Sequence, residues 1–209
     1  MDLTQVQLSV RGTGGLSVAG ANQAGDALVA QGLPPYTEIT RRGGGYQVMN
    51  TTALAALVVR PSTVANLTLF NNNAAGGKSL IIVRAFAFNL VSTAAQARHG
   101  LWLCSHKPGL VSPTADITAI KSLSCKANYG GGAVADTGMT VIDDGWFPWG
   151  PWGDVEPTGV LPGGILEVKV DGAIIVPPTC GVSTQVVSSV VGNTYTTGFM
   201  FYEEQLALE

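Results

Sequence analysis

The stretch TVANLTLFNNNAAGGKSLIIVRAFAFNLV, residues 63–91, is predicted to form two long strands joined by a glycine-containing turn, which makes a hairpin. Residues 64–70 alternate between two faces with the period of two that a pleated strand requires. Residues 80–91 are largely apolar on both faces, and Arg84 is their one charged side chain. Such a strand lies either in the centre of a two-layer stack or beneath another subunit that covers its outer face.

By parity, the pattern of the second strand assigns its residues to two faces. Leu80, Ile82, Phe86, Phe88 and Leu90 are predicted to share one face, interrupted by Arg84. The alternate residues, which are smaller or β-branched, are predicted to share the other.

The turn of this stretch ends in Gly77, Lys78 and Ser79, the residue types that end a phosphate-binding Walker motif. That motif needs a glycine five positions before Gly77, where Asn72 stands. It also needs a helix after the loop, whereas residues 80–91 have the period of a strand. The pattern therefore favours a turn between strands over a nucleotide site.

The last third of the chain has the clearest turn signals. Asp171-Gly172 is typical of a two-residue hairpin turn, here between strands predicted over 165–170 and 173–176. Two further strands are predicted over 182–191 and 194–202, on either side of a glycine-asparagine pair.

The whole pattern predicts an all-β fold. Residues 46–209 contain about eight to ten short strands with turn residues at the spacing of a sandwich, and no long amphipathic helix competes with them. We therefore expect a single β-sandwich or jelly-roll domain over residues 46–209.

Residues 1–45 have no periodic apolar face longer than a few residues. A segment of this kind buries too little apolar surface to offset the entropy that is lost on ordering it. We expect an extended N-terminal arm. It is either a disordered tail or a segment that lies along a neighbouring subunit by strand addition and becomes ordered in the assembly.

Composition narrows the class of protein. Charged residues are 12% of the 209 residues and the net charge is −3, so the chain has no basic field to hold nucleic acid. The mean hydropathy of +0.29 comes without an apolar run approaching 18 residues, which predicts no membrane span but an excess of apolar surface. Such an excess favours an oligomer. The N-terminus has no secretory signal pattern, so we expect synthesis in a cytosol.

The cysteines and histidines predict neither a disulfide framework nor a metal site. Cys104, Cys125 and Cys180 are odd in number and lack C-x-x-C spacing, so buried free thiols are expected. His99 and His106 are seven positions apart, which is not the i, i+2 or i, i+4 spacing of paired metal ligands. We predict no cofactor and no metal.

Catalytic candidates are few. Cys104 and His106 share one strand face by parity, so a Cys-His nucleophile is conceivable, but no local motif supplies a third group or an oxyanion hole. Asp143 and Asp144 are adjacent and are predicted to form a solvated turn, and together with Asp154 they lack the spacing of a calcium loop. We expect no enzyme activity, and a hydrolase on a jelly-roll scaffold is the weakest of three functional hypotheses.

Four aromatic residues lie within seven positions: Trp146, Phe147, Trp149 and Trp152. The prolines between them exclude a central strand, so the rings are expected on a stiff loop. They either cap one end of the sandwich core or form a protruding patch that binds a partner protein or the face of a sugar.

The pattern over residues 46–204 resembles small β-sandwich virion proteins of tailed bacteriophages. This resemblance is one of overall pattern and transfers no site residue. It implies a head decoration or cement protein, often a trimer on the capsid surface, or a tail or fibre adaptor. The segments that carry it are NTT (50–52), LFNNNAAGGKSLIIVRAFAF (69–88), LPGGILEVKVDGAIIVPP (161–178) and TYTTGFMFYEE (194–204).

These observations lead to one expected function and one alternative. We expect a capsid decoration protein, made in the host cytoplasm, that forms a homo-oligomer, most simply a trimer, and clamps the major capsid protein at the virion surface. The alternative is a receptor- or carbohydrate-binding module of a tail or fibre, which would use Trp146, Trp149 and Trp152 as a stacking platform. The expected partner contacts are Tyr36, Arg41, Arg42, Trp146, Phe147, Trp149 and Trp152.

Overall fold

The chain divides into two compact units, Met1–Glu38 and Ile39–Glu209. The computed structural model describes residues 6–9, 16–21, 27–28, 36–92, 97–109, 120–125, 128–150, 152–155 and 164–206. Among these residues, no helix is long and apolar enough to cross a membrane.

The first unit contains a small antiparallel sheet of β1 (Val6–Ser9), β2 (Leu16–Ala21) and β3 (Ala27–Leu28). The one described helix, α1 (Thr37–Arg41), spans the boundary between the units. The segment that was expected as an extended arm thus has strands that pair with one another. Its docking on a neighbouring subunit stays a prediction.

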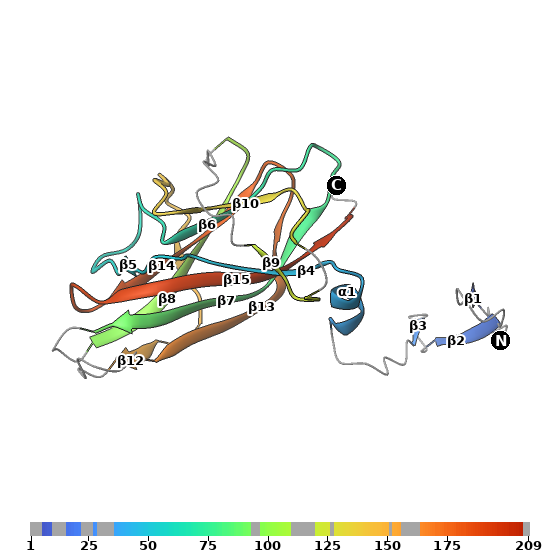
Figure 1. The fold of residues 1–209 in the computed structure, drawn as a ribbon, viewed down its shortest axis with the longest axis horizontal. Coiled ribbons are helices and arrows are strands. Elements are labelled where there is room, and N and C mark those ends of the chain that lie inside the picture. Colours follow the sequence, from blue (N-terminus) through green and yellow to red (C-terminus); the bar gives the residue numbers. More distant parts are fainter. Residues whose placement is uncertain are drawn as a thin grey trace. The chain divides into compact units, whose positions relative to one another are not determined.

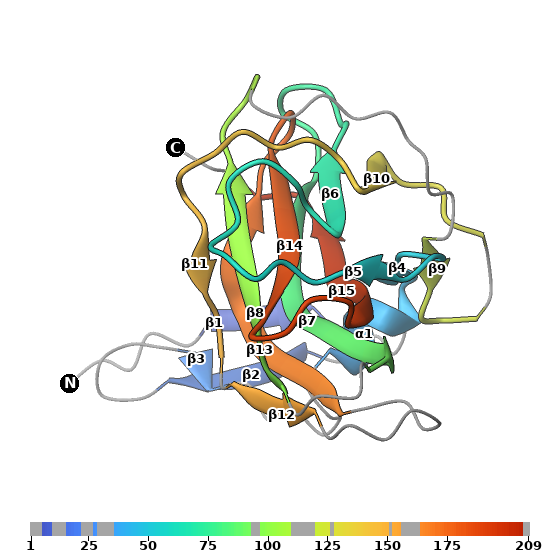
Figure 2. The ribbon, with the colours of Figure 1, turned by 90° about the vertical axis from the view of Figure 1, so that its left-hand side faces the viewer.

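The second unit is a β-sandwich, as the sequence predicts, and its strands form two antiparallel sheets (Figures 1 and 2). The β7 sheet has the order β13-β7-β15-β4-β9, with β5 also paired to β15. Its strands are β4 (Gly45–Met49), β5 (Leu54–Ala55), β7 (Ser79–Val91), β9 (Lys121–Ser122), β13 (Ile165–Val176) and β15 (Thr194–Glu204).

The facing sheet, the β14 sheet, has the order β10-β6-β14-β8-β11, with β12 also paired to β8. Its strands are β6 (Leu67–Asn71), β8 (Ala97–His106), β10 (Ala133–Thr137), β11 (Phe147–Pro148), β12 (Gly153–Val155) and β14 (Gly181–Ser188). The core lies between the two sheets. Its largest fully buried side chains include Tyr195, Phe199 and Phe201 of the β7 sheet and Leu67 and Leu101 of the β14 sheet.

The predicted hairpin of residues 63–91 is wrong. β6 pairs with β10 and β14, whereas β7 pairs with β13 and β15, so the connection between β6 and β7 crosses from one sheet to the other. The buried side chain of Asn71 holds the start of this crossover, because its Nδ2 donates to the carbonyl oxygens of Lys78 (2.8 Å) and Val176 (2.9 Å). Strands with two apolar faces can be buried in either sheet, so their pattern does not say which strands pair.

The predicted faces of β7 are also wrong, because a β-bulge reverses the alternation in the middle of the strand. Ile82 pairs with Phe201 and Arg84 with Met200, so Val83 is an extra residue in β7. The parity of the side chains therefore changes there.

Before the bulge Leu80 and Ile82 point into the core, and after it Ala85 and Ala87 do, all at 0% exposure. Phe86 and Phe88 are left on the outer face of the sheet, where they are half-buried.

Asp171-Gly172 forms a bulge and not the predicted hairpin turn. β13 is one strand whose two halves both pair with β7, with the register shifting between Lys169, opposite Arg84, and Ile174, opposite Ile82. Asp171 has φ 46° and Gly172 has φ 82°. Positive φ at both residues suits a tight hairpin turn and also suits a bulge, and the pairing with β7 selects the bulge.

We predict that Gly172→Ala lowers the free energy of unfolding by about 1 kcal/mol, because an L side chain is strained at positive φ. Urea unfolding measures the change. Gly130→Ala is the matched control, since Gly130 is not at positive φ and a Cβ there meets no atom within 4 Å. Equal stability of the two variants would contradict the assignment of this bulge.

Candidate functional site

A buried polar row crosses the outer face of the β14 sheet. Ser183 of β14 lies opposite Thr68 of β6 on one side and opposite Cys104 of β8 on the other, so the three side chains share one face. His106 lies two residues after Cys104 on the same face. Asp143 approaches from the loop of residues 138–146. We call these five residues the His106 cluster.

The loop of residues 138–146 covers this face. Val141 and Trp146 pack with Ala65 and Cys104 into a small second core. Arg60 fastens the loop from outside, because its Nη2 donates to the carbonyl oxygens of Asp144 and of Trp146, the latter at 3.2 Å. The outward side chains of β6 and β14 are therefore buried within this one chain.

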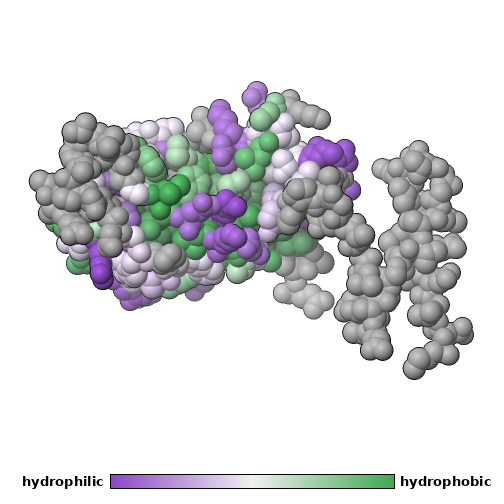
Figure 3. Space-filling view, turned by 90° about the horizontal axis from the view of Figure 1, so that it is seen from below, coloured by the Kyte–Doolittle hydropathy of each residue, from purple (hydrophilic) through white to green (hydrophobic). Residues whose placement is uncertain are grey.

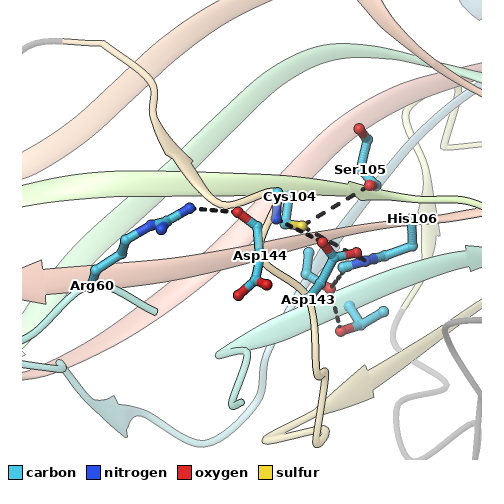
Figure 4. A network of polar contacts seen from close by, with 9 residues as sticks. Arg60, Cys104, Ser105, His106, Asp143 and Asp144 are labelled. Atoms are coloured by element: carbon cyan, nitrogen blue, oxygen red, sulfur yellow. Dashed lines mark hydrogen bonds and ion pairs between the residues drawn. The ribbon is translucent and has the colours of Figure 1, made fainter. Parts of the chain in front are cut away.

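Hydrogen bonds connect the row from end to end (Figure 4). The Oγ1 of Thr68 lies 2.7 Å from the Oγ of Ser183, which lies 2.7 Å from the Nε2 of His106. The other ring nitrogen, Nδ1, lies 3.0 Å from the Oδ2 of Asp143 and 3.7 Å from the Sγ of Cys104. With the ring proton on Nδ1, each hydroxyl can donate to the next acceptor and Nδ1 donates to the carboxylate.

Burial and hydrogen bonds shift the pKa values of the titratable side chains in this row. It lowers the pKa of His106, although the hydrogen bond and the charge of Asp143 act in the opposite direction, so the imidazole is neutral at neutral pH. Burial, followed by the Asp143 carboxylate, raises the pKa of the Cys104 thiol to about 12. For Asp143, burial raises the pKa, but hydrogen bonds from the Gly145 N–H and from His106 outweigh it and leave the pKa below its ordinary value.

Ser183, His106 and Asp143 have the connectivity of a hydrolase triad, with a hydroxyl on Nε2 and a carboxylate on Nδ1. Ser183, however, is 0% exposed on the central strand of its sheet, and its Oγ is shared with Thr68. A substrate does not reach this oxygen in the described conformation. In this conformation, the arrangement gives each buried polar group of the row a hydrogen-bond partner.

The sequence indicated part of this cluster. The parity of Cys104 and His106 on one strand is confirmed. The prediction that Asp143 lies in a solvated turn is wrong in one respect: its Oδ1 does accept from the Gly145 N–H, but its Oδ2 reaches the buried His106 from 37 positions away. Ser183 and Thr68 carry no local signal, because their contact depends on the order of the strands.

The four aromatic residues of the predicted patch do not share one surface. Trp146 is buried at 2% exposure in the small second core. Phe147 and Trp149 are half-buried with their rings 5.3 Å apart, and the Trp149 Nε1 donates to the carbonyl oxygen of Lys169 at 3.3 Å. Trp152 is 53% exposed. A stacking platform of three tryptophans is therefore not formed, although Trp152 alone presents its ring.

The expected contact residues near the N-terminus lie around α1. Tyr36 precedes the helix and is 39% exposed. Arg41 lies in its last turn and is exposed, as is Arg42. Arg42 lines a shallow hollow with Lys78 and Glu203.

The outer face of the β7 sheet differs from that of the β14 sheet, because apolar side chains remain exposed on it. Ile165 is 60%, Met49 45% and Ile175 41% exposed. The face also carries the Arg84–Glu167 ion pair. Figure 3 shows one side of the molecule, on which a cluster of hydrophilic residues lies next to hydrophobic residues. We define the apolar outer face as Met49, Ile81, Phe86, Phe88, Ile165, Ile175 and Met200.

Comparisons of the chain with protein-family models and with curated protein sequences found no match. The His106 cluster and the apolar outer face are therefore the two features of the molecule that bear on its function.

We predict that Ser183→Ala lowers the free energy of unfolding by about 1–3 kcal/mol, because it leaves the buried Nε2 of His106 without a partner. Chemical denaturation measures the difference. Ser105→Ala, at an exposed position on the same strand as His106, serves as the control and is expected to stay within about 0.5 kcal/mol of the unmodified chain. If Ser183→Ala matched this control, the hydrogen-bonded row would have no part in stability.

Proposed function

We propose that this chain is a structural protein of a tailed-bacteriophage virion, and that it assembles with copies of itself as a decoration, or cement, protein of the head. The observation that carries the proposal is the apolar outer face of the β7 sheet. The resemblance of residues 46–204 to small β-sandwich virion proteins supports the same assignment. On this proposal the chain lies at the capsid surface, bound to the major capsid protein.

The outer face has the chemistry of a surface that another subunit covers. Phe88 lies opposite Ile165, and Ile81 lies opposite Ile175, so apolar side chains meet across β7 and β13. The ring of Phe86 lies over Gly198, which leaves room for it on β15. Burying such side chains stabilises an interface by about 25 cal/mol for each Å² of apolar surface removed from water.

This face carries an ion pair and a further exposed cation, Lys169, which lies opposite Arg84. A lysine can keep its ammonium group in water at the edge of a contact while its apolar stem is covered. Arg84 and Glu167 are paired with each other across β7 and β13, and their side chains are 41% and 43% exposed. A charged pair that keeps its partner costs less to bury than a single charge does. The pair can therefore lie inside a contact between copies without being separated.

Closed symmetry and mass action explain how such contacts would serve a shell. Copies joined head to tail form a closed ring when the rotation between neighbours divides a full turn evenly. A rotation of one third of a turn gives the trimer proposed here. A ring that binds the assembled lattice, and not free capsid subunits, stabilises that lattice by mass action. We assign residues 1–38 to contact with a neighbouring copy and the exposed Trp152 to contact with the capsid lattice.

We predict that light scattering gives a mass of three times the chain mass of 21.6 kDa. Replacing both Ile165 and Ile175 by Glu raises the dissociation constant by roughly 100-fold, because each carboxylate loses water in the contact. The control is Val191→Glu, at a residue that is 72% exposed outside the two sheets. A chain that stays monomeric at high concentration, or a double variant that assembles like the control, would refute the proposed interface.

A second prediction concerns the shell. Shells of the cognate major capsid protein are expected to dissociate at a higher temperature or denaturant concentration when this chain is added, because it binds the assembled form. Turbidity or scattering follows the dissociation. The chain without residues 1–35 tests the contribution of the N-terminal segment. Shells that dissociate identically with and without the full chain would remove the cement role.

A further inference from the structure

Three metal-ligating atoms converge in the His106 cluster. The Nδ1 of His106 faces both the Sγ of Cys104, at 3.7 Å, and the Oδ2 of Asp143, at 3.0 Å (Figure 4). All three atoms lie within 4.8 Å of one another. A single ring N–H can donate to one of these two groups and not to both in good geometry. A cation placed between them would bind all three atoms at once.

We propose that Cys104, His106 and Asp143 bind one Zn²⁺ ion. Zinc takes thiolate, imidazole and carboxylate ligands at tetrahedral angles, with bonds of about 2.3 Å to sulfur and about 2.0–2.1 Å to nitrogen and oxygen. These values place a sulfur and a nitrogen ligand about 3.5 Å apart and a nitrogen and an oxygen ligand about 3.3 Å apart. The observed separations of 3.7 and 3.0 Å differ from those of a bound site by a few tenths of an ångström. The third separation, from the Cys104 sulfur to the carboxylate oxygen, is at most 4.8 Å, against about 3.6 Å around a bound ion, so Asp143 closes on Cys104 by up to about an ångström when zinc binds.

The groups around the three ligands suit the ion. When Nδ1 binds zinc, the proton of the ring lies on Nε2, which then donates to the Oγ of Ser183, 2.7 Å away. Ser183 can in turn donate to Thr68, so the row of hydroxyls serves either tautomer by rotating its hydrogens. A hydrogen bond donated by the second ring N–H is the usual support of a zinc-bound histidine.

The carboxylate is also held for this role. The Oδ1 of Asp143 accepts a 2.7 Å hydrogen bond from the Gly145 N–H, which leaves Oδ2 facing the histidine and the thiol. A Cβ at Gly145 would lie 2.9 Å from Oδ1 and 3.4 Å from the Cys104 Sγ, so this glycine lets the backbone close over the ligands.

The charges balance when the ion is bound. A thiolate and a carboxylate contribute two negative charges, which Zn²⁺ neutralises in surroundings that also contain Val141 and Trp146. The thiol proton leaves to solvent on binding, since the thiolate is the form that binds metal.

The ion has a path to the site and a fourth ligand. An open hollow beside the cluster is lined by Ser105, Lys107, Ile142, Asp143 and Asp144. The side chain of Asp143 is 13% exposed, whereas that of His106 is fully covered, so the carboxylate is the side from which an ion enters. Water from the hollow completes the tetrahedron. The bound ion would fasten the loop of residues 138–146 to β8.

The test uses the full-length chain without a histidine tag, after treatment with a chelator. Calorimetric titration with Zn²⁺ is expected to give one equivalent for each chain, and the thermal midpoint of unfolding is expected to rise with Zn²⁺ concentration. Co²⁺ serves as a spectroscopic probe, whose thiolate-to-metal absorption band reports Cys104. We expect Cys104→Ser and Asp143→Asn each to weaken Zn²⁺ binding by at least about 100-fold, because each removes a direct ligand.

Cys125→Ser is the matched control, because Cys125 lies outside the cluster and is an exposed free thiol, contrary to the buried thiol that was expected. It is expected to keep one equivalent of Zn²⁺ and the thiolate band of Co²⁺. The proposal is overturned if the unmodified chain binds no stoichiometric Zn²⁺, or if its Co²⁺ spectrum lacks the thiolate band. It is also overturned if Asp143→Asn, at a partly exposed position, binds Zn²⁺ as the control does. The two measurements on the unmodified chain do not require any variant to fold.

Discussion

The pairing of β7 with β13 on one side and β15 on the other is the constraint on which the sandwich depends. The bulge at Val83 lets this strand bury large side chains, Leu80 and Ile82, in one half and small ones, Ala85 and Ala87, in the other. Packing small side chains inward leaves the phenylalanines of β7 on the outside. The interior is thereby filled, and the apolar surplus of the strand lies on the outer face of its sheet.

The chain covers the outer face of the β14 sheet more than that of the β7 sheet. Above the β14 sheet, the loop of residues 138–146 buries Trp146 and Cys104, and Asp143 joins a hydrogen-bonded row beneath it. The outer face of the β7 sheet keeps Ile165 and Met49 exposed. This asymmetry within one chain is the physical reason for proposing that copies of the chain cover the apolar outer face.

Composition and turn residues predict the all-β class and the sandwich, because periodicity and turn chemistry are local properties. Pairing is not local, so the bulges at Val83 and Asp171-Gly172 were missed, and with them the true faces of β7. The candidate site was predicted in part for the same reason. Cys104 and His106 share a strand, whereas Asp143 and Ser183 reach His106 through tertiary contacts.

Side-chain footprinting with hydroxyl radicals over a range of chain concentrations shows whether a second copy covers the apolar outer face. Met49 and Trp152 are similarly exposed in the single chain, at 45% and 53%, but only Met49 belongs to the apolar outer face. We expect modification of Met49 to fall as the concentration rises, while modification of Trp152 on the free protein does not change. Constant modification of Met49 at every concentration would show that water, and no second copy, covers this face.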